Sequence, residues 1–133
     1  MKLADDGYCF ACGPKNPIGL KLNFHLSGET IITEFTPKKE HQGYLNIVHG
    51  GIITTLLDEA MVKLAIALKM PAVTAHLDVR LKEPLNVGEK IIVKAEILSK
   101  TTKLLETSAK AVTADNIIIA EAKGKLIRIN TSR

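Results

Sequence analysis

Residues 48–60 read VHGGIITTLLDEA, and this stretch, a glycine-rich turn opening a long apolar helix, decides the fold. Glycine lets the backbone approach a ligand closely, and the first N–H groups of a helix have no intrahelical partners. Those donors, reinforced by the helix dipole, suit an oxygen atom that is gaining negative charge. Asp58 lies nine residues after His49, which is roughly 13 Å of rise along a helix. If the donors and the acid serve one reaction, we therefore expect them to meet across two chains.

The helical spacing extends from Gly50 to about Lys69, and Pro71 follows its end. Apolar residues recur on one side at intervals of three and four, namely Ile53, Leu56, Leu57, Ala60, Met61, Leu64 and Leu68. On a helical wheel, Asp58 and Glu59 lie on the two flanks of the opposite face, which is neither fully apolar nor freely charged. Such a face suits an interface with a second subunit, so we expect a homodimer.

Strand-like segments precede and follow the helix, at residues 20–27, 30–36, 74–82, 90–99, 103–114 and 117–129. In the first strand after the helix, Ala75, Leu77, Val79 and Leu81 alternate with polar residues, as in a half-buried strand. Short turns, one of them at residues 115–116, separate these later strands, so we expect successive strands to pair antiparallel. One helix covers only part of such a sheet. The sequence therefore predicts an α+β fold in which a curved antiparallel sheet of five to six strands wraps around one central helix.

Length and composition indicate a single domain over residues 1–133, with residues 1–19 as an N-terminal loop segment and 50–69 as the central helix. The chain is 46% hydrophobic and 24% charged, which is typical of globular proteins. No apolar run has the length of a membrane span, and the first residues lack the apolar core of a secretion signal, so we expect a cytoplasmic protein without membrane contact. A net charge of +4 and an aromatic content of 4% disfavour nucleic-acid binding.

Cys9 and Cys12 form a CFACG motif near the N-terminus. A structural zinc site usually needs four ligands, and the chain has no second cysteine pair. Two chains could supply four thiolates, and His25 or His41 could contribute, but we favour a reduced loop that packs on the body without a metal. A thioredoxin-like redox role is disfavoured because the pair does not lie between a strand and a helix.

The order of elements, with HGG at residues 49–51 and an acid at Asp58, resembles the hotdog-fold acyl-CoA thioesterases, and the phenylacetate-pathway type most closely. Residues 9–20, CFACGPKNPIGL, are similar to a segment of one branch of that superfamily. Residues 74–84, TAHLDVRLKEP, are similar to the strand that follows the hotdog helix. The resemblance covers nearly the whole chain. It implies a hotdog fold, an acyl-CoA substrate, no cofactor, and homodimers that we expect to pair into homotetramers.

The resemblance also implies roles for four residues. The backbone N–H of Gly50 polarises the thioester carbonyl, and His49 shapes that turn close to the thioester. Asp58, contributed by the second chain, acts as a general base or as a nucleophile. Thr74 helps to place a water molecule. An ordinary structural role stays open for each, since glycines often permit close packing and most acids on helices are solvated.

One position departs from the family pattern, because several members carry an amide side chain six residues before the histidine, where this chain has Gly43. Gln42 or Asn46 could supply the amide from a neighbouring position. Arg80 and Lys82 could hold the phosphates of coenzyme A or could simply keep a sheet face solvated. The candidates for substrate contact are Gln42, Asn46, Gly51, Thr55, Glu59, Arg80 and Lys82.

Three functions from different classes remain open, and an acyl-CoA thioesterase is the preferred one. A hotdog enoyl hydratase or dehydratase resembles a different pattern, in which an Asp or Glu is paired with a His, and that pattern is not found in this sequence. A non-catalytic acyl-CoA-binding protein would keep the fold without turnover. Thiol release from acyl-CoA distinguishes the first function from the third.

Overall fold

One helix packs against one sheet over residues 3–129, the part of the chain that this computed structural model describes. The elements are β1 (His25–Ser27), β2 (Thr30–Phe35), the 3₁₀ helix η1 (Lys39–His41), α1 (Gly50–Ala67), β3 (Ala72–Leu81), β4 (Ile91–Lys100), β5 (Leu104–Thr113) and β6 (Ile118–Arg128). The helix and every strand after it begin and end within two residues of the predicted positions. Within the described range, no helix has the length and apolar character that crossing a membrane requires.

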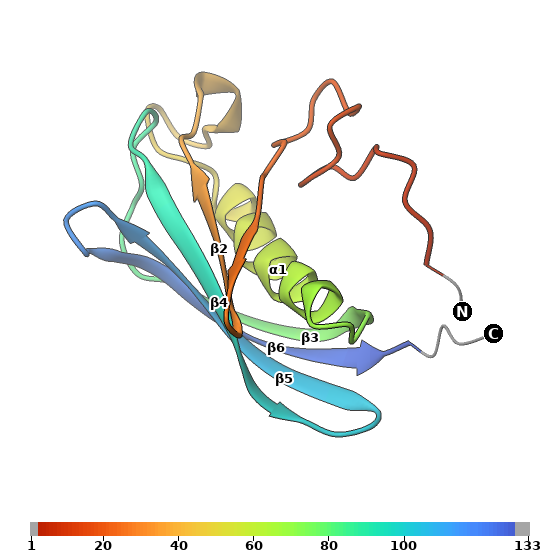
Figure 1. The fold of residues 1–133 in the computed structure, drawn as a ribbon. Coiled ribbons are helices and arrows are strands. Elements are labelled where there is room, and N and C mark those ends of the chain that lie inside the picture. Colours follow the sequence, from red (N-terminus) through yellow and green to blue (C-terminus); the bar gives the residue numbers. More distant parts are fainter. Residues whose placement is uncertain (1–2, 130–133) are drawn as a thin grey trace.

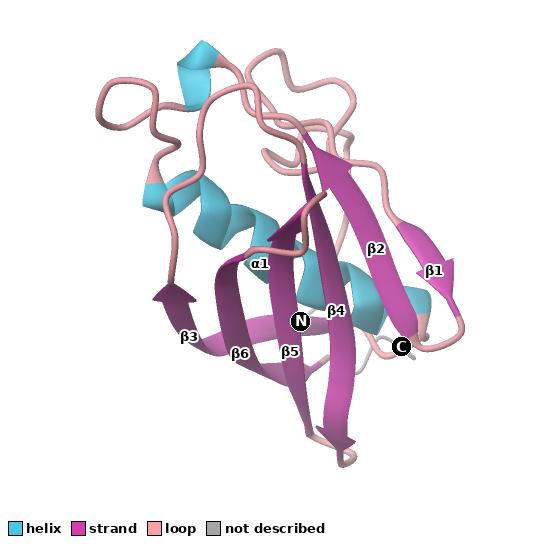
Figure 2. Ribbon diagram, turned by 90° about the vertical axis from the view of Figure 1, so that its left-hand side faces the viewer, coloured by secondary structure: helices cyan, strands magenta, loops and turns pink. Residues whose placement is uncertain are grey.

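The strands form one antiparallel sheet in the order β1-β2-β4-β5-β6-β3. The sheet curves around α1, which lies along its concave face (Figures 1 and 2). Tight turns join β4 to β5 and β5 to β6. In the second turn Asn116 has a positive φ of 64°, and its N–H donates to the carbonyl of Thr113 at 3.0 Å. The predicted α+β architecture, with one central helix and a curved antiparallel sheet, is confirmed.

The pairing of β3 differs from the prediction, because β3 lies beside β6 at one edge of the sheet and not beside β4. Backbone hydrogen bonds, including the two given next, hold the connection from β3 to β4, residues 82–90, against the segment that precedes α1. Val48 N–H donates to the carbonyl of Leu85, and Gly88 N–H donates to the carbonyl of Pro37, each at 2.9 Å. Leu85 is fully buried. These contacts join residues far apart in the chain, so the spacing of apolar residues carries no signal of them.

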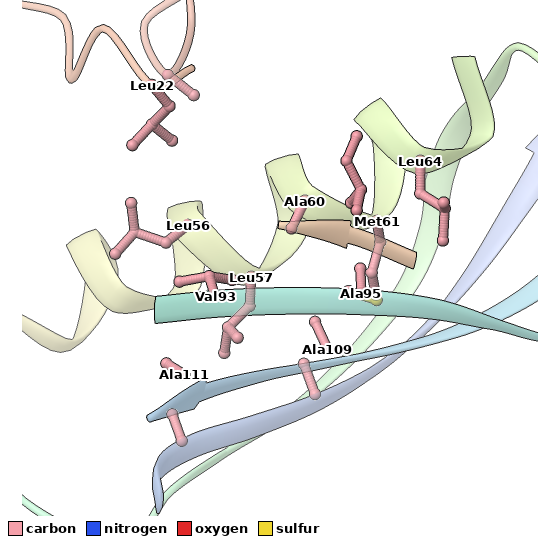
Figure 3. Packing of buried hydrophobic residues seen from close by; sticks show 14 of the residues in the cluster. Leu22, Leu56, Leu57, Ala60, Met61, Leu64, Val93, Ala95, Ala109 and Ala111 are labelled. Carbon is pink, nitrogen blue, oxygen red and sulfur yellow. The ribbon is translucent and has the colours of Figure 1, made fainter. Parts of the chain in front are cut away.

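The helix is buried on its sheet side and partly covered on the other side. Six of its side chains have no exposed surface: Leu56, Leu57, Ala60, Met61, Leu64 and Ala65. Small side chains on the strands, including Ala95, Ala109 and Ala111, let the helix approach the sheet closely (Figure 3). Leu22 lies on the opposite side of α1 and is 5% exposed (Figure 3). Burial of each leucine stabilises the fold by about 1.5–3 kcal/mol.

The first strand is shorter than predicted, since β1 covers only His25–Ser27 of the expected residues 20–27. Lys21 has a positive φ of 54°, which interrupts the extended chain. The N–H groups of Leu20 and Leu22 donate to carbonyl groups of the N-terminal segment at 2.8 and 3.0 Å. The chain before β1 therefore binds the N-terminal segment instead of the sheet, and this segment packs on the body as predicted.

The alternation of β3 reverses at a β-bulge between Thr74 and His76. We expected Ala75 on the half-buried face, but it is exposed, whereas Thr74 and Leu77 are partly buried. A bulge adds one residue that has no partner on the neighbouring strand, so the side chains exchange faces there. Leu81, also expected on that face, is 54% exposed. The bulge turns Thr74 toward α1, where it meets a helix residue.

Candidate functional site

The first turn of α1 leaves one backbone donor free. His49 is the N-cap residue, and its Nδ1 accepts a hydrogen bond from the N–H of Gly51 at 2.8 Å. The N–H groups of Ile52 and Ile53 donate to the carbonyl of His49 at 3.0 and 3.3 Å. Within residues 3–129, the N–H of Gly50 has no acceptor. It is therefore available to a ligand, and it is the donor that the family resemblance assigns to the thioester carbonyl.

The loop before α1 fixes the position of His49. Its N–H donates to the carbonyl of His41 at 2.9 Å. The ring of His41 is held in turn, because its Nδ1 accepts a hydrogen bond from the N–H of Lys38 at 2.9 Å. Burial lowers the pKa of His41, which favours the neutral imidazole that this acceptor role requires. His41 thus fixes the backbone that leads into the helix, and the N–H of Lys38 fixes the ring of His41.

Gln42 and Asn46, the candidates for the missing amide, are joined by a hydrogen bond between the side chain of Gln42 and the backbone of Asn46. The N–H of Asn46 donates to Oε1 of Gln42 at 3.0 Å, and Asn46 has a positive φ of 63°. The amide oxygen of Gln42 therefore stabilises a turn. Gly43 lies against His49, where an added Cβ would stand 3.4 Å from the His49 Cα, an ordinary van der Waals distance. The position at which the family carries an amide has room for a side chain.

The two glycines at the helix start have different neighbours. A Cβ on Gly50 would lie 2.8 Å from Cδ1 of Leu81, the flexible end of that side chain. A Cβ on Gly51 would lie 3.0 Å from Nδ1 of His49, so a side chain there would push against the capping ring. The hydroxyl of Thr55 donates to the carbonyl of Gly51 at 2.9 Å, which ties this candidate substrate contact to the backbone. Because Leu81 is the last residue of β3, its contact with Gly50 places the end of this strand close to the N–H of Gly50.

Asp58 and Thr74 form a hydrogen-bonded pair between α1 and β3. The hydroxyl of Thr74 donates to Oδ1 of Asp58 at 2.7 Å, and both side chains are partly buried. The bond engages one carboxylate oxygen and fixes the orientation of the group. In the same chain Gly50 precedes Asp58 by eight residues, about 12 Å of helix rise. The structure thus brings Asp58 to Thr74 and the His49 ring to the N–H of Gly51, but it does not join these two pairs within one chain.

The basic candidates on β3 and just after it differ in their partners. Nζ of Lys82 lies 2.6 Å from Oε1 of Glu121, and Lys110 lies 3.8 Å from the other oxygen of that carboxylate. The hydrogen bond from Lys82 lowers the pKa of Glu121. Arg80 is exposed and forms no salt bridge with another residue of the described range. Arg80 is therefore the more available of the two for an anionic ligand.

Glu59 lies on the other flank of α1, and its carboxylate meets the two cysteines of the N-terminal segment. Sγ of Cys9 lies 3.7 Å from Oε2 of Glu59, and one ligand atom from each of Cys9, Cys12 and Glu59 lies within 4.8 Å of the others. Both thiols are free. Burial raises the pKa of Cys12 to about 12, and its contacts with Glu59 and Cys9 act in the same direction. Glu59, one of the candidates for substrate contact, thus lies beside the two cysteines.

Lys63 lies one helical turn after Glu59 and beside Cys12. Burial alone would lower the pKa of Lys63, but the contact with Cys12 and the carboxylates of Glu59 and Asp5 raise it. The convergence of these groups was not predicted from the sequence, because about fifty residues separate the cysteines from Glu59. The one available signal was that the helical wheel places Glu59 on the flank opposite Asp58.

Comparisons with known proteins identify the family and the relatives of this chain. Residues 45–120, which include the helix start, Asp58 and Thr74, match the family model of the thioesterase superfamily. Human acyl-coenzyme A thioesterase 13 is 28% identical over 99 residues, which cover 73% of this chain and 66% of the human protein. The chain thus spans just under two thirds of the length of that relative.

Two solved structures share the fold. The PaaI protein from the phenylacetic acid degradation operon of E. coli has a TM-score of 0.79 at 17% identity, covering 84% of this chain and 81% of PaaI. A hypothetical thioesterase from Streptococcus pneumoniae TIGR4, solved with coenzyme A, has a TM-score of 0.77 at 13% identity, covering 81% of this chain and 85% of that protein. The family model matches more than half of the chain, and this chain therefore belongs to the thioesterase superfamily.

Proposed function

We propose that this protein hydrolyses acyl-CoA thioesters to a free acid and coenzyme A. The observation that carries this proposal is the 2.7 Å hydrogen bond from Thr74 to Asp58, which orients a carboxylate in a member of the thioesterase superfamily. The N–H of Gly50, which has no acceptor among residues 3–129, would supply the complementary donor. The human relative is named an acyl-coenzyme A thioesterase, and the pneumococcal structure contains coenzyme A.

The two groups match the chemistry of thioester hydrolysis. The reaction passes through an anionic tetrahedral species, which a preorganised donor at a helix N-terminus stabilises, and one such donor is worth about 3–4 kcal/mol. Asp58 would take a proton from water as that water attacks the carbonyl carbon, or would attack the carbon itself and give an anhydride that water then cleaves. In both routes the C–S bond breaks and coenzyme A leaves as its thiolate.

A second copy of the chain would complete the site, and β3 suggests how. Thr74, beside Asp58, lies near one end of this edge strand, and Leu81, beside Gly50, lies at the other end. An edge strand offers unpaired backbone groups to another chain. If two copies pair antiparallel through β3 about a two-fold axis, the Thr74 end of one strand faces the Leu81 end of the other. Asp58 would then approach Gly50 of the partner subunit.

The wider setting of this activity is part of the same proposal. We expect the homodimers to pair into homotetramers and to act in the cytoplasm. Arg80, which is exposed on the edge strand, would contact the phosphates of coenzyme A, because guanidinium groups bind phosphate through charge-assisted hydrogen bonds.

An acyl-CoA panel tests the activity, with a thiol-reactive dye to detect the released coenzyme A. The wild type should release thiol with saturation kinetics, and Asp58→Asn should lower kcat by at least about a hundredfold because either role needs an ionised carboxylate. A mass measurement by light scattering should show the same oligomer for both proteins. Saturable binding without thiol release would favour an acyl-CoA-binding protein, and loss of the enoyl absorbance of crotonyl-CoA would favour a hydratase.

A further inference from the structure

The cluster formed by Cys9, Cys12 and Glu59 lies on the flank of α1 away from Asp58 and Thr74, and the proposed hydrolysis does not use it. We propose that these three side chains bind one zinc ion per chain, which fastens the N-terminal segment to the outer face of α1. The site is contained in one chain and does not depend on the proposed hydrolysis. From the sequence we favoured a reduced loop without a metal, because one chain offered only two cysteine ligands. The structure places Glu59 beside them as a third candidate ligand.

The spacing of the three side chains fits a tetrahedral ion. With Zn–S bonds of about 2.3 Å and Zn–O bonds of about 2.0 Å, tetrahedral angles place two sulfurs about 3.8 Å apart and a sulfur and an oxygen about 3.5 Å apart. In the structure Sγ of Cys9 lies 3.7 Å from Oε2 of Glu59, and no pair of the three ligand atoms is separated by more than 4.8 Å. The ligand atoms would have to move closer by at most about 1.3 Å for all three to bind one ion.

The loop that carries the cysteines is built to hold them together. The N–H of Gly13 donates to the carbonyl of Cys9 at 2.8 Å, and a Cβ on Gly13 would lie 2.3 Å from the backbone N of Cys9. No other residue fits this turn without moving the backbone. The N–H of Lys15 donates to the carbonyl of Gly7 at 2.9 Å, which closes a second turn around the first. The backbone therefore presents both sulfurs to Glu59 from a fixed loop.

The charges and donor types agree with a thiophilic divalent cation. Two thiolates and one carboxylate carry a charge of about −3, so a zinc ion leaves about −1, which the ammonium group of Lys63 offsets. Binding would release the two thiol protons to solvent. Soft sulfur donors select zinc over magnesium or calcium. A cavity of about 640 Å³, lined by Asp5, Cys9, Cys12, Glu59 and Lys63, gives access for a water molecule as the fourth ligand.

Metal binding to the full chain tests this site. The protein is purified with reductant, stripped with a chelator, and titrated with zinc and with Co²⁺, which reports thiolate coordination through its visible absorbance. We expect one equivalent of either ion, a cobalt spectrum typical of a tetrahedral site with two sulfurs, and a rise in the thermal unfolding midpoint on adding zinc. Cys9→Ser, Cys12→Ser and Glu59→Gln should each lose stoichiometric binding.

A matched control and a fold check make the result decisive. Glu40→Gln removes an exposed carboxylate outside the cluster and should keep one equivalent. Circular dichroism shows whether each variant is folded, and the wild-type titration stands even if a cysteine variant is not. Absence of tight zinc and cobalt binding to the reduced wild type would overturn the proposal. Half an equivalent per chain would also overturn it, because it would indicate an ion shared between two copies.

Discussion

At the scale of single residues, the hydroxyl group of Thr74 orients Asp58, and Gly50 provides the N–H donor of the candidate oxyanion site. The hydroxyl of Thr74 donates to one carboxylate oxygen of Asp58 at 2.7 Å, and the other oxygen accepts no hydrogen bond from the described residues. The ring and carbonyl of His49 accept the next three N–H donors of the helix, which leaves the N–H of Gly50 without an acceptor in the part of the chain that the structure describes. Each feature can be removed by a substitution that leaves the rest of the site in place.

Replacing Gly50 by proline removes the free N–H while keeping the helix start. Proline suits the first helical position, and His49, at φ −61° and ψ 132°, already has the extended backbone that precedes proline. We expect Gly50→Pro to lower kcat by about 10²–10³-fold, as for loss of one oxyanion donor. Gly50→Ala is the control, because it meets the same Leu81 methyl group but keeps the N–H. Equal activities for the two variants would exclude this role of the Gly50 N–H.

Replacing Thr74 by valine removes the hydrogen bond to Asp58 at nearly constant volume. A hydrogen bond to a charged group is worth about 1.5–3 kcal/mol, so Thr74→Val should lower kcat by about 10–100-fold. Thr74→Ser keeps the hydroxyl and should stay near the wild-type rate. Steady-state kinetics with the best acyl-CoA decides between them. If the valine variant matches the serine variant, Asp58 does not depend on this bond for its orientation.

At the scale of elements, the helix and the later strands were predictable because their signals are local. Spacing of three and four residues located α1, and turn residues located the ends of β4, β5 and β6. The bulge in β3 was not predictable, since it depends on pairing with β6 and not on the residues of β3 alone. β1 was overestimated because Leu20 and Leu22 bind the N-terminal segment, a contact between distant parts of the chain.

The stability of the fold should depend on the sheet-facing side of α1 far more than on its outer side. Leu57 has no exposed surface, so Leu57→Ala should lower the free energy of unfolding by about 2–5 kcal/mol. Ile66 on the same helix is 46% exposed, and Ile66→Ala should cost below about 1 kcal/mol. Urea unfolding followed by circular dichroism measures both. Similar losses for the two variants would contradict the observed packing.

At the scale of the whole molecule, the sequence predicted that the acid and the helix start lie too far apart to act within one chain. The structure supports that expectation, since Asp58 turns to Thr74 and Gly50 lies beside Leu81. The roles proposed for Gly50, Asp58 and Thr74 came from the family resemblance. The cluster of Cys9, Cys12 and Glu59 could not be foreseen, because only the folded chain brings the N-terminal loop to that flank of the helix.

Mixing two inactive variants tests whether the site is shared between chains. Asp58→Asn keeps the helix start, and Gly50→Pro keeps the acid, so a mixed dimer contains one site with both intact groups. Random exchange of equal amounts should restore about a quarter of wild-type activity, since half of the dimers are mixed and each has one good site. Thiol release before and after subunit exchange measures this. No recovery after verified exchange would show that each chain works alone.

The position of β3 has a consequence for how the proposed sites communicate. In a two-fold pair, the Thr74 end of the strand would border one reaction centre and the Leu81 end would border the other. A substrate that displaced Leu81 would press on the same short length of backbone that orients the acid in the opposite centre. Substrate binding at one centre would then change the orientation of the acid at the other centre through a single strand, and the two centres would act cooperatively.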